Sequence, residues 1–367
     1  MKILILKTFP LSFDDWNKVG IIQRELNLYK KIINTSKIKI EFFSYGNKND
    51  QKYIDLINPI KIHTLNSNLK NYYLKLLNSF FIPFYFKNMF KNVDIIQSNQ
   101  FWGSWIGLIA SKLYKKKFIL REGFQFYQFQ TKLNKNKKIK LYLIKKFSYI
   151  IYTLTHKIIV TSNEHKNYLI NNFGINEIKI FIIPNFIDTK IFKNYHLKKH
   201  NRLLFIGRLN YQKNIELAIN AISNSHYVLD IIGHGEKKRY IELSKNLNSK
   251  VNFLENVPNN ELVNFYNKCS FYIICSHFEG NPKTLLEAMA CETPIIAIKS
   301  PGIVEIIDSD SAFLIENDSK ELKKTLDENS EEYEKTKLLG KNARKKILLN
   351  NEIDIIVEKF IKIYQGI

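Results

Sequence analysis

Short apolar runs alternate with amphipathic stretches along most of this chain of 367 residues. In the first half, apolar runs that are typical of strands lie at residues 2–7, 38–45, 93–99, 117–123 and 156–162. Between several of them the apolar residues recur three to four positions apart, as at 21–32, which is the spacing of an amphipathic helix. Strands that alternate with helices in this way indicate a parallel sheet with helices on both faces.

Residues 184–201 interrupt the pattern, because they are polar, basic and irregular. A second alternating set follows, with strands expected at 202–209, 227–233, 251–256, 271–276 and 293–298 and a final helix at 352–364. We therefore predict an α/β chain of two doubly wound domains, residues 1–195 and 196–350, with a helix at 351–367 that packs back on the first. Such folds bind ligands at the carboxyl ends of their strands, so the two sheets are expected to face each other across a cleft that holds the site.

The stretch EGNPKTLLEA at residues 279–288 follows the apolar run FYIICSHF and combines helix-start residues with two glutamates. Pro282 suits the first position of a helix, and Asn281 suits its N-cap. Glu279 would then lie in the loop that faces the helix start, with Glu287 about a turn and a half inside the helix. The free N–H groups and the positive end of the helix dipole can hold an anion, while the two carboxylates take hydroxyl groups beside it. A sugar attached to a diphosphate is such a ligand.

A second informative stretch is GRLNYQKN at residues 207–214. Gly207 lets the backbone approach a ligand, and the cations of Arg208 and Lys213 lie on either side of a short turn. Fixed cations stabilise a diphosphate leaving group, because its negative charge rises as the bond to the sugar breaks. Taken alone, the stretch is also compatible with a surface turn that carries two solvated cations.

The formal net charge of +22 would fit a nucleic-acid partner, but the kind of basic residue argues against one. Only six of the 56 basic residues are arginine, and lysine is spread over both halves, whereas nucleic-acid sites show clustered arginine with stacking aromatics. We expect no nucleic-acid partner, and attraction to anionic lipid stays open. No apolar run reaches the roughly 18 residues of a membrane helix, and the first run is too short for a signal peptide, so a cytoplasmic protein is expected.

The second half resembles the family 4 glycosyltransferases of the GT-B fold. The resemblance rests on GRLNYQKNIELAI, IIGHGEKKRYIEL and SHFEGNPKTLLEAMACETPIIAIKSPGIVEII, and it is specific over residues 202–307. A looser similarity covers residues 160–192, and the opening strand with Gly20 resembles the first glycine loop of the family.

The resemblance implies a role for each matching residue. Arg208 and Lys213 would hold the donor diphosphate and Glu279 would hold hydroxyls of the donor sugar, and these three are the catalytic candidates. The further donor-binding candidates are Gly20, Gly207, Gly280, Asn281, Pro282, Lys283, Thr284 and Glu287, the last of which would bind the ribose. Members of the family retain the anomeric configuration, use nucleotide-diphospho-sugars and need no metal or other cofactor in the site, so none is expected here.

The first half departs from the family in its glycine loop and after the strand at 117–123. The loop reads KVGII where two glycines are common, so only Gly20 corresponds. Many members carry a histidine where this chain reads FILREGFQF, and either Arg121 or Glu122 is the acceptor-side candidate for that place. A structural ion pair is the alternative interpretation of these two residues.

Two segments of the first half point to the acceptor. Residues 71–91 combine eight aromatics with lysines, and residues 132–154 place five apolar side chains on one helical stripe behind a run of lysines. Basic amphipathic helices bind anionic membrane surfaces. The alternative is a helix whose stripe faces the core and whose lysines face water.

Together these features predict a retaining glycosyltransferase that moves a sugar from a nucleotide-diphospho-sugar to a growing, lipid-linked glycan. The expected setting is bacterial surface-polysaccharide synthesis, of lipopolysaccharide or capsule, on the inner face of the cytoplasmic membrane, where the protein is peripheral. The alternative is a non-catalytic GT-B subunit that binds a nucleotide-sugar or a partner glycosyltransferase. The intact donor motif favours catalysis, whereas the departure at residues 121–124 favours the alternative.

Overall fold

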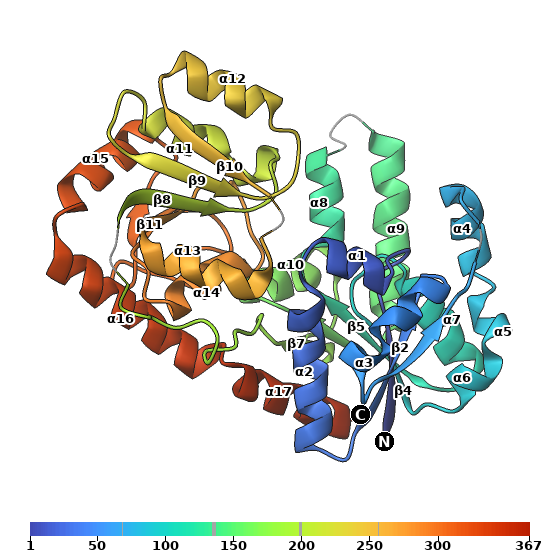
Figure 1. Cartoon of the computed structure of the whole chain (residues 1–367). Coiled ribbons are helices and arrows are strands. Elements are labelled where there is room, and N and C mark those ends of the chain that lie inside the picture. The colour runs from blue at the N-terminus through green and yellow to red at the C-terminus, as the bar shows by residue number, and fades with distance from the viewer. Residues whose placement is uncertain (68, 134–136, 198–199, 256) are drawn as a thin grey trace. The chain divides into compact units, whose positions relative to one another are not determined.

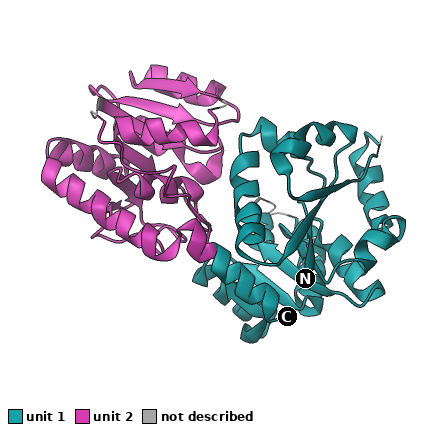
Figure 2. Ribbon diagram, turned by 60° about the horizontal axis from the view of Figure 1, so that its bottom comes forward, with its two compact units in different colours: residues 1–183, 357–367 teal, residues 184–356 magenta. Residues whose placement is uncertain are grey.

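The computed structural model of the chain describes residues 1–67, 69–133, 137–197, 200–255 and 257–367 (Figure 1). It divides into two compact units, which are described separately below (Figure 2). Unit 1 contains residues 1–183 and 357–367, and unit 2 contains residues 184–356.

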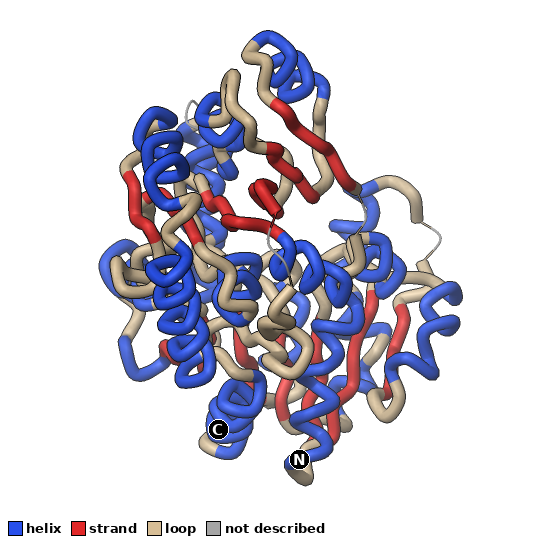
Figure 3. The backbone as a smooth tube through the Cα atoms, turned by 60° about the vertical axis from the view of Figure 1, so that its left-hand side comes forward, coloured by secondary structure: helices blue, strands red, loops and turns tan. Residues whose placement is uncertain are grey.

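Unit 1 is built on a seven-stranded parallel sheet with the order β3-β2-β1-β4-β5-β6-β7, whose strands are drawn in red in Figure 3. The strands are β1 (Lys2–Leu6), β2 (Lys39–Ser44), β3 (Lys61–Thr64), β4 (Ile95–Ser98), β5 (Lys117–Glu122), β6 (Lys157–Val160) and β7 (Ile180–Ile182). The central strand β1 is apolar along most of its length because helices cover it on both faces.

Helices cover both faces of this sheet. Unit 1 contains α1 (Phe13–Lys18), α2 (Ile22–Thr35), α3 (Ile54–Ile57), α4 (Tyr72–Ser79), α5 (Ile82–Tyr85), α6 (Lys87–Lys91), α7 (Ser104–Leu113), α8 (Phe126–Leu133), α9 (Lys138–Leu154), α10 (Asn163–Phe173) and the 3-10 helices η1 (Lys48–Tyr53) and η2 (Glu177–Lys179). Successive strand residues point to opposite faces, so Ile96 joins the core under α7 and α9, whereas Gln97 faces the other layer. That other layer includes α2, where the ring of Tyr29 packs against Phe42.

The helix α17 (Ile353–Gln365) begins in unit 2 and ends in unit 1. Its Phe360 and Tyr364 are buried, and the Tyr364 hydroxyl donates to the Gln97 side chain at 2.9 Å. The Lys157 ammonium donates to the carbonyl oxygen of Ile363 at 3.2 Å. The end of this helix is therefore part of the core of unit 1.

Unit 2 begins at Pro184, earlier in the chain than the boundary after residue 195 that the sequence suggested. The reason is that Ile187 and Phe192, which lie in the irregular basic segment, are buried in the hydrophobic core of unit 2. Because their neighbours in the sequence are charged, these two core residues could not be recognised from the sequence.

A six-stranded parallel sheet, β10-β9-β8-β11-β12-β13, forms the centre of unit 2. Its strands are β8 (His200–Ile206), β9 (Val228–Ile232), β10 (Lys250–Leu254), β11 (Cys269–Ile274), β12 (Ile295–Ile298) and β13 (Phe313–Ile315). The helices are α11 (Ile215–Ala221), α12 (Lys238–Asn246), α13 (Leu262–Lys268), α14 (Lys283–Ala290), α15 (Ser319–Asn329) and α16 (Tyr333–Asn350), with 3-10 helices η3 (Tyr211–Lys213) and η4 (Asn259–Glu261). Residues of α13, α14 and α16 form the core on one face, and residues of α11, α12 and α15 form it on the other.

Both units are thus doubly wound parallel sheets, as predicted. Among the described residues, no helix is both long enough and apolar enough to cross a membrane.

Candidate active site

The loop between β11 and α14 presents the start of α14 at the carboxyl end of the sheet of unit 2. The helix begins at Lys283 with Pro282 as its N-cap, so the prediction of Asn281 as N-cap was wrong by one residue. The reason is that Asn281 is engaged elsewhere: its side-chain oxygen accepts from the Asn185 N–H at 2.8 Å, and its carbonyl accepts from the Asn185 amide at 2.6 Å. No side chain caps the start of α14, which therefore keeps the character of an anion site.

Glu287 lies on the buried side of α14 and is fully enclosed. Its Oε1 accepts from the Asn259 amide at 2.8 Å, and its Oε2 accepts from the Tyr266 hydroxyl at 3.0 Å. Burial together with the Glu287 charge raises the pKa of Tyr266 well above its ordinary value, so this hydroxyl stays a donor. The negative charge of this carboxylate makes it a strong acceptor for hydroxyl groups.

Lys213 and Glu279 form an ion pair with an N···O distance of 2.5 Å. Lys213 ends η3, Glu279 lies in the loop before α14, and both side chains are largely buried. Gly207 leaves room for the lysine, because a Cβ there would lie 3.3 Å from the Lys213 Cε. Arg208, the next residue, is exposed. The structure therefore brings two of the three catalytic candidates into direct contact and leaves the third at the surface.

Two glycines let the loops of this edge pack backbone against backbone. A Cβ at Gly233, which follows β9, would lie 1.9 Å from the carbonyl oxygen of Gly207. A Cβ at Gly302 would lie 2.1 Å from the carbonyl oxygen of Glu279, and the φ of Gly302 is +80°. Gly302 had not been assigned a role, although the SPGIVE stretch that contains it is part of the family resemblance.

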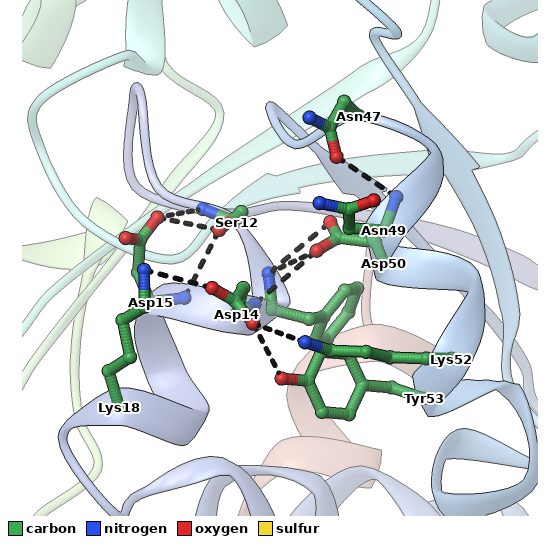
Figure 4. Close-up of polar contacts among 10 residues, drawn as sticks. Ser12, Asp14, Asp15, Lys18, Asn47, Asn49, Asp50, Lys52 and Tyr53 are labelled. Atoms are coloured by element: carbon green, nitrogen blue, oxygen red, sulfur yellow. Dashed lines mark hydrogen bonds and ion pairs between the residues drawn. The ribbon is translucent and has the colours of Figure 1, made fainter.

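In unit 1, the start of α1, the helix that Gly20 follows, is held by a carboxylate from another element (Figure 4). Asp50 of η1 accepts from the Phe13 N–H at 3.2 Å, at the start of α1, and from the Ser44 hydroxyl at 2.5 Å. Asp14 of α1 accepts in turn from Lys52 at 2.7 Å. Gly20 follows α1 with a φ of +69°, a conformation that favours glycine.

Lys7, the residue after β1, is a buried amine that sequence reasoning missed. Its side chain is only 1% exposed, and its Nζ lies 3.3 Å from the ring centroid of Trp16 and 3.9 Å from that of Phe13. Burial lowers the pKa of Lys7 to about 6. The run KILILK gave no sign of this, because a lysine at a strand end usually reaches water.

The two acceptor-side candidates point to opposite faces of β5, and both are buried. Arg121 donates from Nη1 to the Asn99 side chain at 2.9 Å. Glu122 accepts from the Phe126 N–H at 2.8 Å and from the Tyr152 hydroxyl at 2.9 Å. Because neighbouring strand residues diverge, these two residues do not form the ion pair considered from the sequence.

The donor-side candidates of unit 2 therefore gather around the carboxyl ends of β8, β9 and β11, whereas Gly20, Arg121 and Glu122 lie in unit 1. Within the described residues, no group of three or more histidine, cysteine, aspartate or glutamate side chains is arranged to hold a metal ion. This edge of unit 2 can bind a ligand through cations, an uncapped helix start and two carboxylates.

Two family models match the chain. The model of group 1 glycosyl transferases matches residues 186–346, and the model of glycosyltransferase family 4 matches residues 36–191. The match to the second half coincides with the unit that carries the donor-side candidates.

Among curated proteins, an uncharacterized glycosyltransferase of Methanocaldococcus jannaschii is 33% identical over 198 residues, which is 52% of this chain and 54% of that protein. The chain thus spans about half the length of this relative. An N,N'-diacetylbacillosaminyl-diphospho-undecaprenol alpha-1,3-N-acetylgalactosaminyltransferase of Campylobacter jejuni is 25% identical over 340 residues, with 86% of this chain and 88% of that protein covered. Among solved structures, a sucrose-phosphate synthase of Thermosynechococcus elongatus matches with a TM-score of 0.83 at 17% identity, over 100% of this chain and 99% of that one. At that identity the likeness concerns the fold.

Proposed function

This chain belongs to the group 1 glycosyltransferases of family 4, and from that premise we propose that it moves a sugar from a nucleotide-diphospho-sugar to a growing glycan. The family, the GT-B fold and the glycosyltransferase class expected from the sequence are confirmed. We propose in addition which groups bind the donor, what kind of acceptor is used and that the anomeric configuration is retained.

The observation that carries the proposal is the cluster around the start of α14. We infer that the diphosphate of the donor takes Lys213 away from Glu279, to which it is paired at 2.5 Å. Arg208, which is exposed beside it, supplies a second cation, and the uncapped start of α14 at Lys283 and Thr284 supplies backbone N–H groups. Charge that develops on the leaving diphosphate is thus stabilised by two cations and a helix start.

Loss of the contact with Lys213 also allows Glu279 to bind the donor sugar. Once Lys213 contacts phosphate, the Glu279 carboxylate regains acceptor positions for hydroxyls of the donor sugar. Glu287, held by Asn259 and Tyr266, accepts from the ribose hydroxyls. In this proposal the cations and the helix start balance the diphosphate charge without a metal ion, and departure and attack take place on one face of the sugar, so its configuration is retained.

We further propose a lipid-linked acceptor at the cytoplasmic face of the membrane, in the synthesis of a bacterial surface polysaccharide. The Campylobacter jejuni relative is named as a transferase that acts on N,N'-diacetylbacillosaminyl-diphospho-undecaprenol. The basic, aromatic-rich segments of unit 1 support the same setting.

A thermal-shift screen against UDP-, GDP-, ADP- and dTDP-sugars tests the donor, because a ligand that binds only the folded state raises its stability. One nucleotide class should stabilise the protein, and that donor should then give transfer to a diphospho-undecaprenol-linked sugar with an unchanged anomeric configuration. Stabilisation without transfer to any acceptor would support the non-catalytic alternative, and no stabilisation by any nucleotide would refute the donor site.

A further inference from the structure

A pocket opens on the face of the unit 2 sheet that α13 covers, and its volume is about 190 Å³. It is lined by Leu204 of β8, Phe265 of α13 and Cys269 at the start of β11, and its walls are mostly apolar. Arg202, which also lines it, lies five residues before Gly207, and five strand residues span about 16 Å. The pocket is therefore closer to the amino ends of the strands and separate from the donor-side candidates at their carboxyl ends.

An ion pair and a separate cation form the polar side of the pocket. Asp230 accepts from the Arg202 Nε at 2.6 Å, and the Arg202 Nη2 contacts its other oxygen. The Asn252 amide donates to the same carboxylate at 2.9 Å. The charge of Asp230 is thus balanced within the sheet, whereas Lys268 lines the pocket and pairs with no carboxylate of the described residues. The lining therefore carries one unbalanced positive charge beside its apolar walls.

We propose that this pocket binds a small aromatic carboxylate. A cavity of roughly 150 Å³ with apolar walls holds a benzene ring, so a volume of about 190 Å³ holds such a ring with one small substituent. The Phe265 ring favours an aromatic partner, whereas the hydroxyl groups of a sugar would lose water without gaining partners on apolar walls. The Lys268 ammonium favours a negatively charged substituent. The ligand therefore differs in class from both the sugar donor and the glycan acceptor.

The helix that lines the pocket also carries a partner of Glu287. Phe265 lines the pocket, and the next residue, Tyr266, donates to the Glu287 Oε2 at 3.0 Å. A ribose bound to Glu287 and an aromatic ring packed on Phe265 both favour the same position of α13. Each ligand then raises the affinity of the protein for the other by the same factor. The pocket is thus an effector site, and this coupling rests on the proposed function, which assigns Glu287 to the ribose.

Titration of the whole chain with benzoate, followed by saturation-transfer difference NMR without any nucleotide, tests the pocket directly. Benzoate should bind with a Kd of about 1 mM or below, which is ordinary for a ligand of its size. Benzyl alcohol has the same ring without the charge and should bind at least about tenfold more weakly. Lys268→Gln should weaken benzoate binding by a similar factor and leave the binding of benzyl alcohol unchanged.

The matched control is Lys245→Gln in α12. Like Lys268, Lys245 is an exposed lysine in the last turn of a helix of unit 2, but it does not line the pocket. This variant should bind benzoate and benzyl alcohol as the wild type does.

A second variant blocks the pocket instead of changing its charge. Asn264 is exposed on α13 and lines the pocket, so the indole of Asn264→Trp should fill it and abolish benzoate binding with little change in unfolding temperature. In wild type, benzoate should slow the alkylation of Cys269 by iodoacetamide, measured by peptide mass spectrometry. Equal benzoate binding by wild type and Asn264→Trp, equal binding of benzoate and benzyl alcohol, or no binding at about 10 mM benzoate would overturn the proposal.

The nucleotide affinity measured with and without saturating benzoate tests the coupling. Wild type should bind the nucleoside diphosphate selected by the thermal-shift screen about fivefold more tightly with benzoate, and Asn264→Trp should show no response. An unchanged affinity in wild type would overturn the coupling. Benzoate binding by a protein that binds no nucleotide would overturn the proposed function while supporting the pocket, so the two failures are distinguishable.

Discussion

Replacing Glu287 by glutamine tests the donor site most directly, because the structure separates its effect on binding from its effect on folding. The carboxylate is fully buried and accepts hydrogen bonds from Asn259 and Tyr266. Glutamine can present its oxygen to Asn259 and its NH₂ group to Tyr266. The Tyr266 hydroxyl can accept that bond, since its own hydrogen can go to the Thr284 carbonyl oxygen at 3.0 Å. The free energy of unfolding should therefore change by less than about 1 kcal/mol.

Nucleotide binding should respond far more strongly to the same change. Glutamine removes the negative charge and turns one side of the group into a donor, so a ribose hydroxyl loses a hydrogen bond to a charged partner. Such a bond contributes about 1.5–3 kcal/mol, which corresponds to a loss of affinity of roughly 10- to 150-fold. Isothermal titration calorimetry with the nucleoside diphosphate selected by the thermal-shift screen measures this loss.

The control is Glu328→Gln on α15, where the glutamate side chain is exposed and paired with Lys324 across one turn. This variant should bind the nucleotide as the wild type does. An affinity of the Glu287 variant within about twofold of wild type would refute the assignment of this residue to the ribose, because even the weakest charged hydrogen bond contributes more.

Three further changes test other parts of the structure. Arg208→Ala should lower the rate of transfer at saturating donor by about 10- to 100-fold with little change in unfolding temperature, because Arg208 is exposed. Lys213→Ala should lower the rate by a similar factor and also lower the unfolding temperature, because it leaves the buried Glu279 carboxylate without its partner. Unchanged rates in both variants would place the diphosphate elsewhere. Gly302→Ala should lower the free energy of unfolding by about 1–3 kcal/mol in urea, since its Cβ would meet the Glu279 carbonyl; stability equal to wild type would contradict this packing. The pKa of Lys7 is about 6 in the folded state against an ordinary 10.5, so the unfolded state binds more protons between these pH values and stability rises with pH. Lys7→Met should therefore stabilise the protein near neutral pH and reduce this slope, and equal slopes in the two proteins would show an ordinary pKa for Lys7.

Most of the long elements could be predicted, because their apolar spacing is regular over many residues. The segment 21–32 is the main part of α2, and 117–123 contains β5. Shorter elements were missed: β7 and β13 have three residues each, too few to show a period. The helix α1 was missed although Ser12 and Asp15 form a capping box at its start, because its six residues are too few to show a helical period.

The sequence predicted that the candidate residues of unit 2 lie near one edge of the sheet, but not which partners they have. Lys213, Glu279 and Glu287 were chosen because the motif places them after strands that end at that edge. Their partners lie in segments that are far apart in the sequence, so spacing could not predict the contacts. Examples are the ion pair between Lys213 and Glu279 and the hydrogen bond from Asn259 to Glu287. The same holds for Asn281, whose engagement with Asn185 moves the N-cap to the next residue.

The path of α17 has a consequence for how the chain is made. Unit 1 needs Phe360 and Tyr364 to complete the layer beside Gln97, yet more than 170 residues of unit 2 separate them from its first part. During synthesis from the N-terminus, the first 183 residues leave the ribosome with that layer open, and unit 2 has emerged before it closes. A chain truncated after residue 352 should thus carry a folded unit 2 and a protease-sensitive unit 1. The helix α17 would decide when unit 1 becomes native.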